Sequence, residues 1–373
     1  MFKAIIVGAG PAGLIAGKYL DNSLILDKKK EIGKPIQCGE GLSRAALLLQ
    51  GITPDPAWIS TTIQKIEVIA PSGKKINLQD AEAGYILDRV AFENFLAKQC
   101  QAEIKLETKV VDLKREKDCW AVYTDNGGIY RSQYIIGADG PLSIVRTKLF
   151  GDKIGILPTY EYLVELEKEI PISTIRLYFD QEKYPNGYVW IFPKSRHTAN
   201  IGLGGYKELD KRFKYFMDTV IVPEFGNYKL LANKSGTITY GGMRIKLFKD
   251  NVFLVGDAGA LIDPILGGGI NNAMISARLA AESILNNSSH LFEKKLKSMS
   301  YFSEDLMYAQ KVLYDLPNSV LNEIVNMLDN KSLLYFKTLS GFLKFFSKPK
   351  LRSRAWQLFK LFSILQRSGT SFG

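Results

Sequence analysis

The sequence contains few residues that form metal sites. Its 373 residues include three cysteines, Cys38, Cys100 and Cys119, and two histidines. Three widely spaced cysteines suit a reducing compartment such as the cytoplasm, and they are too few for a four-cysteine iron–sulfur or zinc site. Two histidines also argue against a histidine-rich metal site. We therefore expect no metal centre.

Long apolar runs are absent as well. No stretch reaches the ~18 consecutive apolar residues that indicate a transmembrane helix. The first predicted strand begins at about Lys3, so we expect no signal peptide. These absences predict a cytoplasmic protein, whose contact with a membrane would be peripheral and at its inner face.

Acidic residues are missing from the last part of the chain. Nine of the 49 Lys and Arg residues follow Asn330, and none of the 38 Asp and Glu residues do, so a nearly neutral body precedes a basic tail. Large apolar residues recur in the tail at helical spacing: Leu333, Phe336, Leu339, Leu343, Phe346, Trp356, Phe359 and Phe362. This pattern is typical of a helix on an anionic membrane surface, and it equally suits a helical cap packed on the protein. Both interpretations stay open, whereas no recognition motif supports nucleic acid as a partner.

The clearest motif lies at the start of the chain. A short apolar run over residues 3–7 predicts a strand, and the pattern G-x-G-x-x-G follows at once. Gly8 permits a sharp turn, Gly10 permits a pyrophosphate to approach the backbone, and Gly13 permits tight packing of the next helix. Asp27 stands where a carboxylate accepts hydrogen bonds from an adenosine ribose. The motif predicts a bound dinucleotide and does not choose between FAD and NAD.

Two more glycine-bearing acidic motifs follow predicted strands. The first is Gly137-Ala138-Asp139-Gly140, and the second is Gly256-Asp257-Ala258-Gly259. After the second, Gly267 to Ile270 opens a helix that we predict from about Asn271 to Leu285. Alternating apolar and polar residues over 63–87 predict an inserted β-hairpin.

Together the three motifs resemble the FAD-binding pattern of the p-hydroxybenzoate-hydroxylase-like flavoprotein superfamily, over roughly the first 285 residues. The resemblance implies FAD as cofactor, with Asp257 accepting a hydrogen bond from its ribityl chain and Asp139 near its pyrophosphate. It also implies that Arg89 reaches the phosphates or the ribityl chain, and that the helix after Gly269 points its amides at the flavin. The residues implied in cofactor binding are Gly8, Gly10, Pro11, Ala12, Gly13, Asp27, Lys28, Cys38, Gly39, Arg89, Val110, Ala138, Asp139, Gly140, Gly256, Asp257, Gly267, Gly268, Gly269 and Ile270.

The expected fold class is α/β, with three parts. They are a discontinuous Rossmann-like FAD-binding domain over 1–62, 85–150 and 243–290, an inserted, mostly antiparallel β-sheet substrate domain over 63–84 and 151–242, and a C-terminal helical, basic amphipathic region over 291–373.

A narrower pattern appears within the predicted β domain. The nine residues that start at Pro185 fit P-x-x-Y-x-W-x-F-P, and Cys38-Gly39-Glu40-Gly41 fits a second signature. Both resemble the geranylgeranyl reductase family, which saturates double bonds of prenyl chains. A period of two puts Tyr188, Trp190 and Phe192 on one face of a strand, which suits either an aromatic core stripe or an apolar wall. The motif favours a wall, so we expect these three rings and Pro193 to bind substrate.

The resemblance implies an FAD-dependent reductase that saturates C=C bonds of a geranylgeranyl or polyprenyl chain on a lipid, by hydride transfer from reduced flavin. Cys38 is the first candidate for the proton donor, and Tyr188 or water are alternatives. The electron source is either NAD(P)H or a ferredoxin-like carrier. Two other functions stay open: a flavin monooxygenase of an aromatic or quinone-like substrate, and a non-catalytic flavoprotein that binds isoprenoid lipid.

Overall fold

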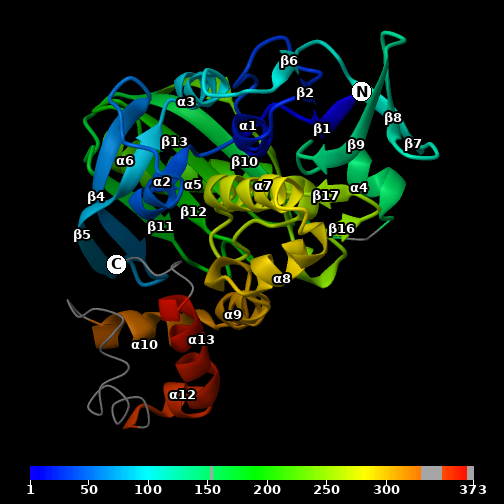
Figure 1. The fold of residues 1–373 in the computed structure, drawn as a ribbon. Coiled ribbons are helices and arrows are strands. Elements are labelled where there is room, and N and C mark those ends of the chain that lie inside the picture. Colours follow the sequence, from blue (N-terminus) through cyan, green and yellow to red (C-terminus); the bar gives the residue numbers. More distant parts are fainter. Residues whose placement is uncertain (152–153, 329–346, 368–373) are drawn as a thin grey trace.

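Residues 1–151, 154–328 and 347–367 are described by a computed structural model, and they fold around two β-sheets (Figure 1). The eight strands of the first sheet are β1 (Phe2–Val7), β2 (Ser23–Leu26), β6 (Glu103–Lys105), β7 (Val110–Arg115), β8 (Trp120–Thr124), β9 (Ile129–Gly137), β16 (Phe248–Lys249) and β17 (Val252–Leu254). Its centre is parallel, in the order β17-β9-β1-β2-β6, while β16 and the β7–β8 hairpin add antiparallel pairs. All four residues of β2 are buried, which is typical of a parallel strand covered on both faces.

Helices pack around this sheet through small residues. They are α1 (Pro11–Tyr19), α3 (Arg89–Ala97), α4 (Ile144–Leu149) and α7 (Ile270–Leu285), while α2 (Arg44–Leu49) contacts α7 and the second sheet. Helices α1 and α7 lie against each other, and α3 contacts α1. Ala12 on α1 and Ala273 on α7 are both buried and both lie beside Gly256, so three segments meet with little side-chain volume between them.

The second sheet is mostly antiparallel. Its nine strands are β3 (Gly41–Ser43), β4 (Ile59–Ile69), β5 (Lys75–Leu87), β10 (Gly155–Leu166), β11 (Thr174–Tyr178), β12 (Val189–Pro193), β13 (Thr198–Gly204), β14 (Tyr228–Asn233) and β15 (Gly236–Tyr240). They follow the order β14-β10-β13-β12-β11-β4-β5-β3, with β15 beside β10, and β11 pairs with β4 in parallel. One face packs on α5 (Leu209–Phe216), a π-helical turn (Met217–Ile221) and α6 (Val222–Phe225), through Val189 and Ile191.

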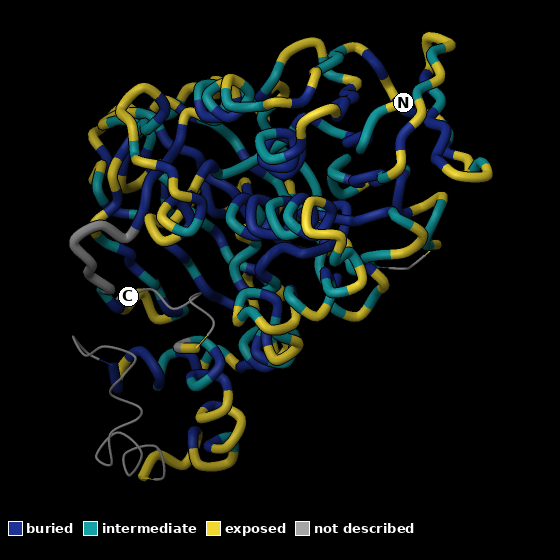
Figure 2. Tube along the Cα trace, in the orientation of Figure 1, coloured by how far each residue is buried: buried dark blue, intermediate teal, exposed yellow. Residues whose placement is uncertain are grey.

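The opposite face of the second sheet meets the C-terminal helices. These are α9 (Asp305–Tyr314), α10 (Asn318–Leu328), α12 (Pro349–Arg352) and α13 (Ala355–Arg367), which lie below the sheets in Figure 1. The preceding α8 (Phe292–Lys297) packs instead on α7 and on the core of the first sheet. Leu358 and Leu361 of α13 share one apolar cluster with Leu306 of α9 and Leu177 of β11. Figure 2 shows the buried stretches inside both sheets and the exposed ones along the outer loops and the outer side of α12 and α13.

The described tail therefore includes a helical cap packed on the protein. The apolar residues expected to continue the pattern over 333–346 lie outside the described residues. Among the described helices, none combines the length and the apolarity that crossing a bilayer requires.

Two local predictions are confirmed. Strands β4 and β5 form the hairpin predicted over 63–87, although β4 already begins at Ile59. Helix α7 occupies the span predicted from Asn271 to Leu285 and starts one residue earlier. The second sheet also takes in β3, at residues 41–43, because β3 pairs with the end of β5. The proposed three-part division of the chain stays a prediction.

Gly13 gives a test of the close contact between α1 and β1. A Cβ at Gly13 would overlap the carbonyl oxygen of Gly8, which is backbone and cannot rotate away. We expect Gly13→Ala to lower the free energy of unfolding by about 1–3 kcal/mol, as overpacking does. Denaturant unfolding measures this change.

The matched control is Gly17→Ala in the same helix. Its Cβ would meet Cδ1 of Ile25 at 2.7 Å, and the end of a side chain can move. A Gly13→Ala protein as stable as the wild type would show that α1 and β1 do not approach as the structure describes.

Candidate functional site

A cavity of about 1280 Å³ opens where the parallel strands of the first sheet end. Val7 at the end of β1, Leu26 at the end of β2 and Val255 after β17 all line it. The cavity then continues along the second sheet, where Ile66 and Leu177 line it. Ligands of open α/β sheets bind at the carboxyl ends of parallel strands. The volume exceeds the ~300–1,000 Å³ typical of one small-molecule site, so a cofactor and a second molecule fit together.

Nearly all the predicted site residues line this one cavity. Of those predicted to bind cofactor or substrate, only Gly13, Gly256 and Pro193 do not. Gly13 and Gly256 instead allow close packing, against the Gly8 carbonyl and against Ala273. The carbonyl of Pro193 accepts a hydrogen bond from Thr61 Oγ1 at 2.7 Å. The individual binding roles stay predictions, but predicted residues as far apart in the sequence as Gly8 and Ile270 do line the same cavity.

The first glycine loop is held by Asp27. The Asp27 carboxylate accepts hydrogen bonds from the backbone N–H of Ala9 at 2.6 Å and of Lys29 at 2.8 Å. Asp27 thus fixes the glycine loop at the start of the chain, and it also lines the cavity. Gly10 lies at the cavity wall, and a Cβ there would meet no described atom within 4 Å. The space beside Gly10 is therefore open to a ligand.

Asp139 binds the start of α4, and Arg146 of the same helix joins the two later motifs. The Asp139 carboxylate accepts hydrogen bonds from Ser143 Oγ and the Ile144 N–H, which places it at the start of α4. The Arg146 guanidinium donates to the carbonyl of Pro141 and to that of Ala258, each at 2.7 Å. Arg146 therefore connects the loop after β9 to the loop after β17. Sequence reasoning assigned it no role, because its partners are backbone carbonyls.

Asp257 lines the cavity in a poorly solvated position. Burial raises the pKa of Asp257 to about 6, although the positive charges of Arg89 and Arg146 act to lower it. Its carboxylate faces the start of α7, where Oδ1 would lie 3.3 Å from a Cβ at Gly269. Gly269 is the N-cap of α7 and Gly10 is that of α1, and in neither case does a described side chain cap the helix. Both helix ends thus present free amides near the cavity.

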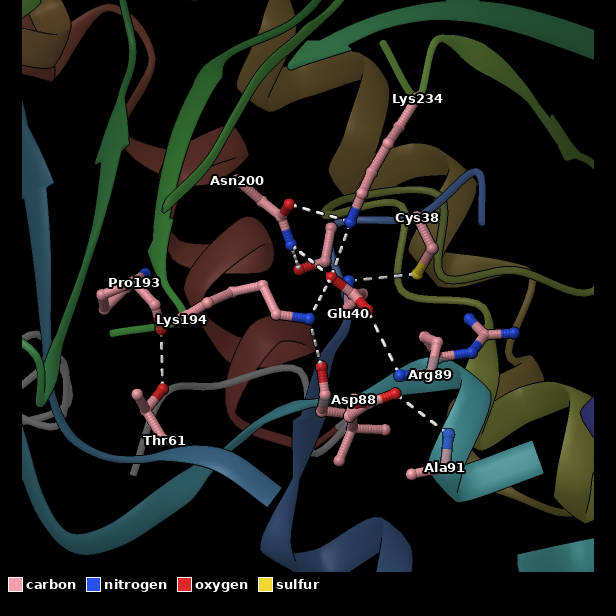
Figure 3. A network of polar contacts seen from close by, with 12 residues as sticks. Cys38, Glu40, Thr61, Asp88, Arg89, Ala91, Pro193, Lys194, Asn200 and Lys234 are labelled. Atoms are coloured by element: carbon pink, nitrogen blue, oxygen red, sulfur yellow. Dashed lines mark hydrogen bonds and ion pairs between the residues drawn. The ribbon is translucent and has the colours of Figure 1, made fainter. Parts of the chain in front are cut away.

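Glu40 organises the loop of the second signature (Figure 3). It is fully buried, and its Oε2 accepts hydrogen bonds from Lys194 Nζ, Lys234 Nζ and Asn200 Nδ2, each at 2.7 Å. Its Oε1 accepts a longer hydrogen bond, of 3.2 Å, from the Arg89 N–H. Figure 3 shows the two lysines reaching Glu40 from different elements. Lys194 directly follows the P-x-x-Y-x-W-x-F-P segment, so Glu40 ties the two signatures together.

The charge on Glu40 is stabilised by these neighbours. Burial raises the pKa of Glu40, but the two ammonium groups of Lys234 and Lys194 lower it by more, so the pKa lies below its ordinary value. Glu40 is therefore ionised at neutral pH. No sequence pattern predicted this cluster, since its members are separated by up to 194 residues.

Cys38, the first candidate for the proton donor, lies at the cavity wall. Its Sγ accepts a hydrogen bond from the Glu40 N–H at 3.2 Å. Burial raises the pKa of the Cys38 thiol, and the nearby Arg89 guanidinium offsets only part of this rise. The thiol is thus kept protonated. Arg89 also lines the cavity and forms an ion pair with Glu93 on its own helix.

The three rings predicted to share a face do so. Tyr188, Trp190 and Phe192 follow one another along the edge of the cavity, with ring centroids 5.7 and 6.5 Å apart. Glycines clear the space around them. A Cβ at Gly202 would overlap the Trp190 ring, and one at Gly39 would lie 3.1 Å from the Phe192 ring. The glycines of the second signature therefore admit these aromatic rings.

The hydroxyls of two tyrosines that line the cavity, Tyr188 and Tyr314, are both bound to backbone carbonyls. The Tyr188 hydroxyl donates to the Leu266 carbonyl and the Tyr314 hydroxyl donates to the Ile265 carbonyl, both at 2.6 Å. These bonds fix the segment that precedes Gly267, and they leave the rings as apolar surface. Burial also raises the pKa of Tyr188, so its hydroxyl remains neutral.

Replacing Glu40 by glutamine tests the cluster. Glu40→Gln leaves the buried ammonium group of Lys234 and the partly buried one of Lys194 without their carboxylate. Breaking a buried pair in this way typically costs about 3–5 kcal/mol. The lowered pKa of Glu40 means that its charge stabilises the fold above its ordinary value of 4.5, and that this contribution is lost as the pH falls below that value. Denaturant unfolding between pH 7 and acid pH should show the loss in the wild type and not in the variant.

Glu169→Gln is the surface control, because Glu169 pairs with Arg196 and both side chains are exposed. This change should cost less than about 1 kcal/mol. Equal stability of Glu40→Gln and Glu169→Gln would contradict the structural role of Glu40.

Comparisons with known proteins agree with this geometry. Residues 156–238 match the geranylgeranyl reductase catalytic domain, a range that contains the entire aromatic strand. The chain is 30% identical to a digeranylgeranylglycerophospholipid reductase of Methanocella arvoryzae over 365 residues, which cover 91% of each protein.

Solved structures show the same fold. A geranylgeranyl bacteriochlorophyll reductase-like protein from Thermoplasma acidophilum matches with a TM-score of 0.80 and 24% identity, over 95% of this chain and 99% of that one. The flavin-dependent halogenase CmlS matches with a TM-score of 0.64 and 17% identity, over 83% of this chain and 64% of that one. The identity and the shared length, together with the two signatures that Glu40 joins, show that the chain belongs to the geranylgeranyl reductase family.

Proposed function

We propose that the protein is an FAD-dependent reductase that saturates C=C bonds of geranylgeranyl chains carried by a glycerophospholipid. The observation that carries the proposal is the continuity of the cavity. It runs without interruption from Gly10 in the first glycine loop to the wall of Tyr188, Trp190 and Phe192. A polar nucleotide-binding end and an apolar end thus belong to one space, as a flavin facing an isoprenoid chain requires.

The residues at the polar end fit FAD. The open space at Gly10 and the uncapped start of α1 suit a pyrophosphate, since free amides and the helix dipole attract an anion. The uncapped start of α7 likewise offers free amides and a helix dipole to the pyrimidine edge of a flavin. Asp27 and Asp257 supply carboxylates at the two ends of such a ligand.

The residues at the apolar end fit a prenyl chain. Ile66, Ile175 and Leu177 of the second sheet form the floor, and the aromatic rings form one side. Tyr314 of α9 closes the space on the side of the C-terminal helices. When bound, reduced FAD supplies the hydride. The protein orients the chain beside it and excludes water and the side reactions that water supports.

Anaerobic reoxidation tests the proposal. Protein loaded with FAD and reduced with dithionite should be reoxidised by a geranylgeranyl glycerophospholipid, and mass spectrometry should find a product two hydrogen atoms heavier for each bond reduced. Gly10→Ala should abolish FAD binding and leave the melting temperature of the apoprotein unchanged, because its Cβ enters the cavity and meets no described atom. Reduction supported by NAD(P)H, or only by a reduced ferredoxin, identifies the electron source.

Two results would contradict the proposal. Oxygen uptake with a hydroxylated aromatic or quinone product would assign a monooxygenase. A reduced flavin that no prenyl lipid reoxidises would instead assign a non-catalytic flavoprotein that binds isoprenoid lipid.

The exposed side of the C-terminal helices suits a membrane surface, and we include peripheral binding in the proposal. Trp356 is 76% and Phe359 is 41% exposed on α13, and their rings contact each other. Lys350 and Arg352 are exposed on the adjoining α12. Exposed aromatic rings beside basic side chains are typical of helices that lie on anionic bilayers.

Liposome sedimentation tests this contact. The double variant Trp356→Ala, Phe359→Ala should bind vesicles with 30% phosphatidylglycerol at least ~10-fold less tightly. Two aromatic rings that become buried in the bilayer contribute several kcal/mol to binding. The control is Ile129→Ala, which removes an exposed apolar side chain from β9 in the other sheet. Equal binding by both variants would exclude α13 as the membrane contact.

A further inference from the structure

Glu161 is a buried acid in the wall of the cavity, beside Trp190. It lies on β10, lines the cavity together with Trp190 and Cys38, and is 2% exposed. Nothing in its sequence context distinguishes it, because β10 also carries Glu165, which is exposed. Its position beside the aromatic wall comes from the pairing of β10 with β13, which in turn pairs with β12.

The hydrogen bonds of Glu161 fit a neutral carboxyl group. Its Oε2 accepts a hydrogen bond from Trp190 Nε1 at 3.2 Å. Its Oε1 has no hydrogen-bond partner among the described residues, although it is buried. A carboxylate in this place would leave a charged oxygen unsolvated, whereas a carboxyl group can carry its proton on Oε1. The geometry therefore favours the protonated form.

The nearby Glu40 strengthens this preference. Both ammonium groups of the cluster bind to Glu40, and Lys234 Nζ is also held by Asn200 Oδ1. Burial raises the pKa of Glu161 to about 8, Lys234 acts to lower it, and the negative charge of Glu40 raises it further. One carboxyl group is thus ionised and its neighbour is protonated. Two acids whose pKa values are driven apart in one site are typical of acid–base catalysis.

Resting on the proposed function, we propose that Glu161 is the catalytic acid that protonates the alkene. The O–H bond at Oε1 breaks, and its proton forms a C–H bond with one alkene carbon through the π electron pair. The hydride from reduced flavin forms the C–H bond at the other carbon. The alkene is reduced by two electrons, the flavin is oxidised by two, and the Glu161 carboxylate regains a proton from solvent.

The other candidate donors are less suited. The Tyr188 hydroxyl already donates to the Leu266 carbonyl. The Cys38 thiol is a weaker acid than Glu161, because burial raises its pKa from a starting value of 9.0. A general acid works best when its pKa lies near the working pH, and Glu161 meets this condition.

Infrared titration of the protein without substrate gives the first test. The wild type should show a carboxyl C=O band that disappears as the pH rises, with a midpoint near 8. The band should be absent in Glu161→Gln and present in the control Glu165→Gln. A wild-type spectrum in which no carboxyl band has a midpoint above that of Asp257, whose pKa is about 6, would overturn the proposal, whatever the activity of the enzyme.

Kinetics give the second test. Glu161→Gln keeps the shape of the side chain and its acceptor for Trp190, so FAD and lipid should still bind with similar affinity. Turnover should fall at least ~100-fold, as the loss of a general acid does, with little change in KM. Wild-type turnover should decrease as the pH rises past about 8, and the residual turnover of the variant should not.

The remaining variants separate the outcomes. Glu161→Asp should recover part of the turnover that Glu161→Gln loses. This variant also keeps the proposal testable if Glu161→Gln does not fold. Cys38→Ala should lose less turnover than Glu161→Gln does, and a larger loss in Cys38→Ala would assign the thiol as donor and overturn our proposal. If the wild type reduces no prenyl lipid, the proposed function fails and the role of Glu161 as donor fails with it, while the infrared band shows separately whether Glu161 is protonated.

Discussion

The buried charge on Glu40 is the interaction on which the site depends. A carboxylate removed from water is stable only when cations and hydrogen-bond donors surround it. Lys194 comes from the segment after β12, Asn200 from β13 and Lys234 from the turn after β14. Satisfying Glu40 thus requires all three segments to be in place. As a result, the loop that carries Cys38 and Gly39 is held against the second sheet, where Gly39 packs on the ring of Phe192.

The same interaction creates an uneven distribution of charge along the cavity. The ammonium groups of Lys194 and Lys234 bind to Glu40, and the nearby Glu161 remains protonated and neutral. The apolar end of the cavity therefore contains no exposed charge from this pair, which suits an isoprenoid chain. At the other end, Asp27 and the start of α1 offer a carboxylate and free amides to a polar ligand. One cavity thereby contains two environments of opposite polarity.

Sequence patterns predicted the parts that depend on local geometry. The loop from Gly8 to Gly13, the hairpin over 63–87 and the start of α7 follow from glycine spacing and from apolar periodicity, which are readable in one segment. The clusters around Glu40 and Glu161 were missed because each needs partners from distant strands, and a single acidic residue gives no sign of them. Arg146 was missed for a related reason, since its partners are backbone carbonyls, which every residue possesses.

The tyrosines of the wall have a consequence for how a chain can lie in the cavity. The hydroxyls of Tyr188 and Tyr314 are both bound to backbone carbonyls, so neither residue has a free hydrogen-bond donor to offer the chain. Van der Waals contact with such a surface is nearly the same at every position along a periodic hydrocarbon. An isoprenoid repeats every four backbone carbons, so a shift by one repeat restores the same contacts with a new double bond in place. A smooth wall of this kind therefore imposes no single register on a periodic chain.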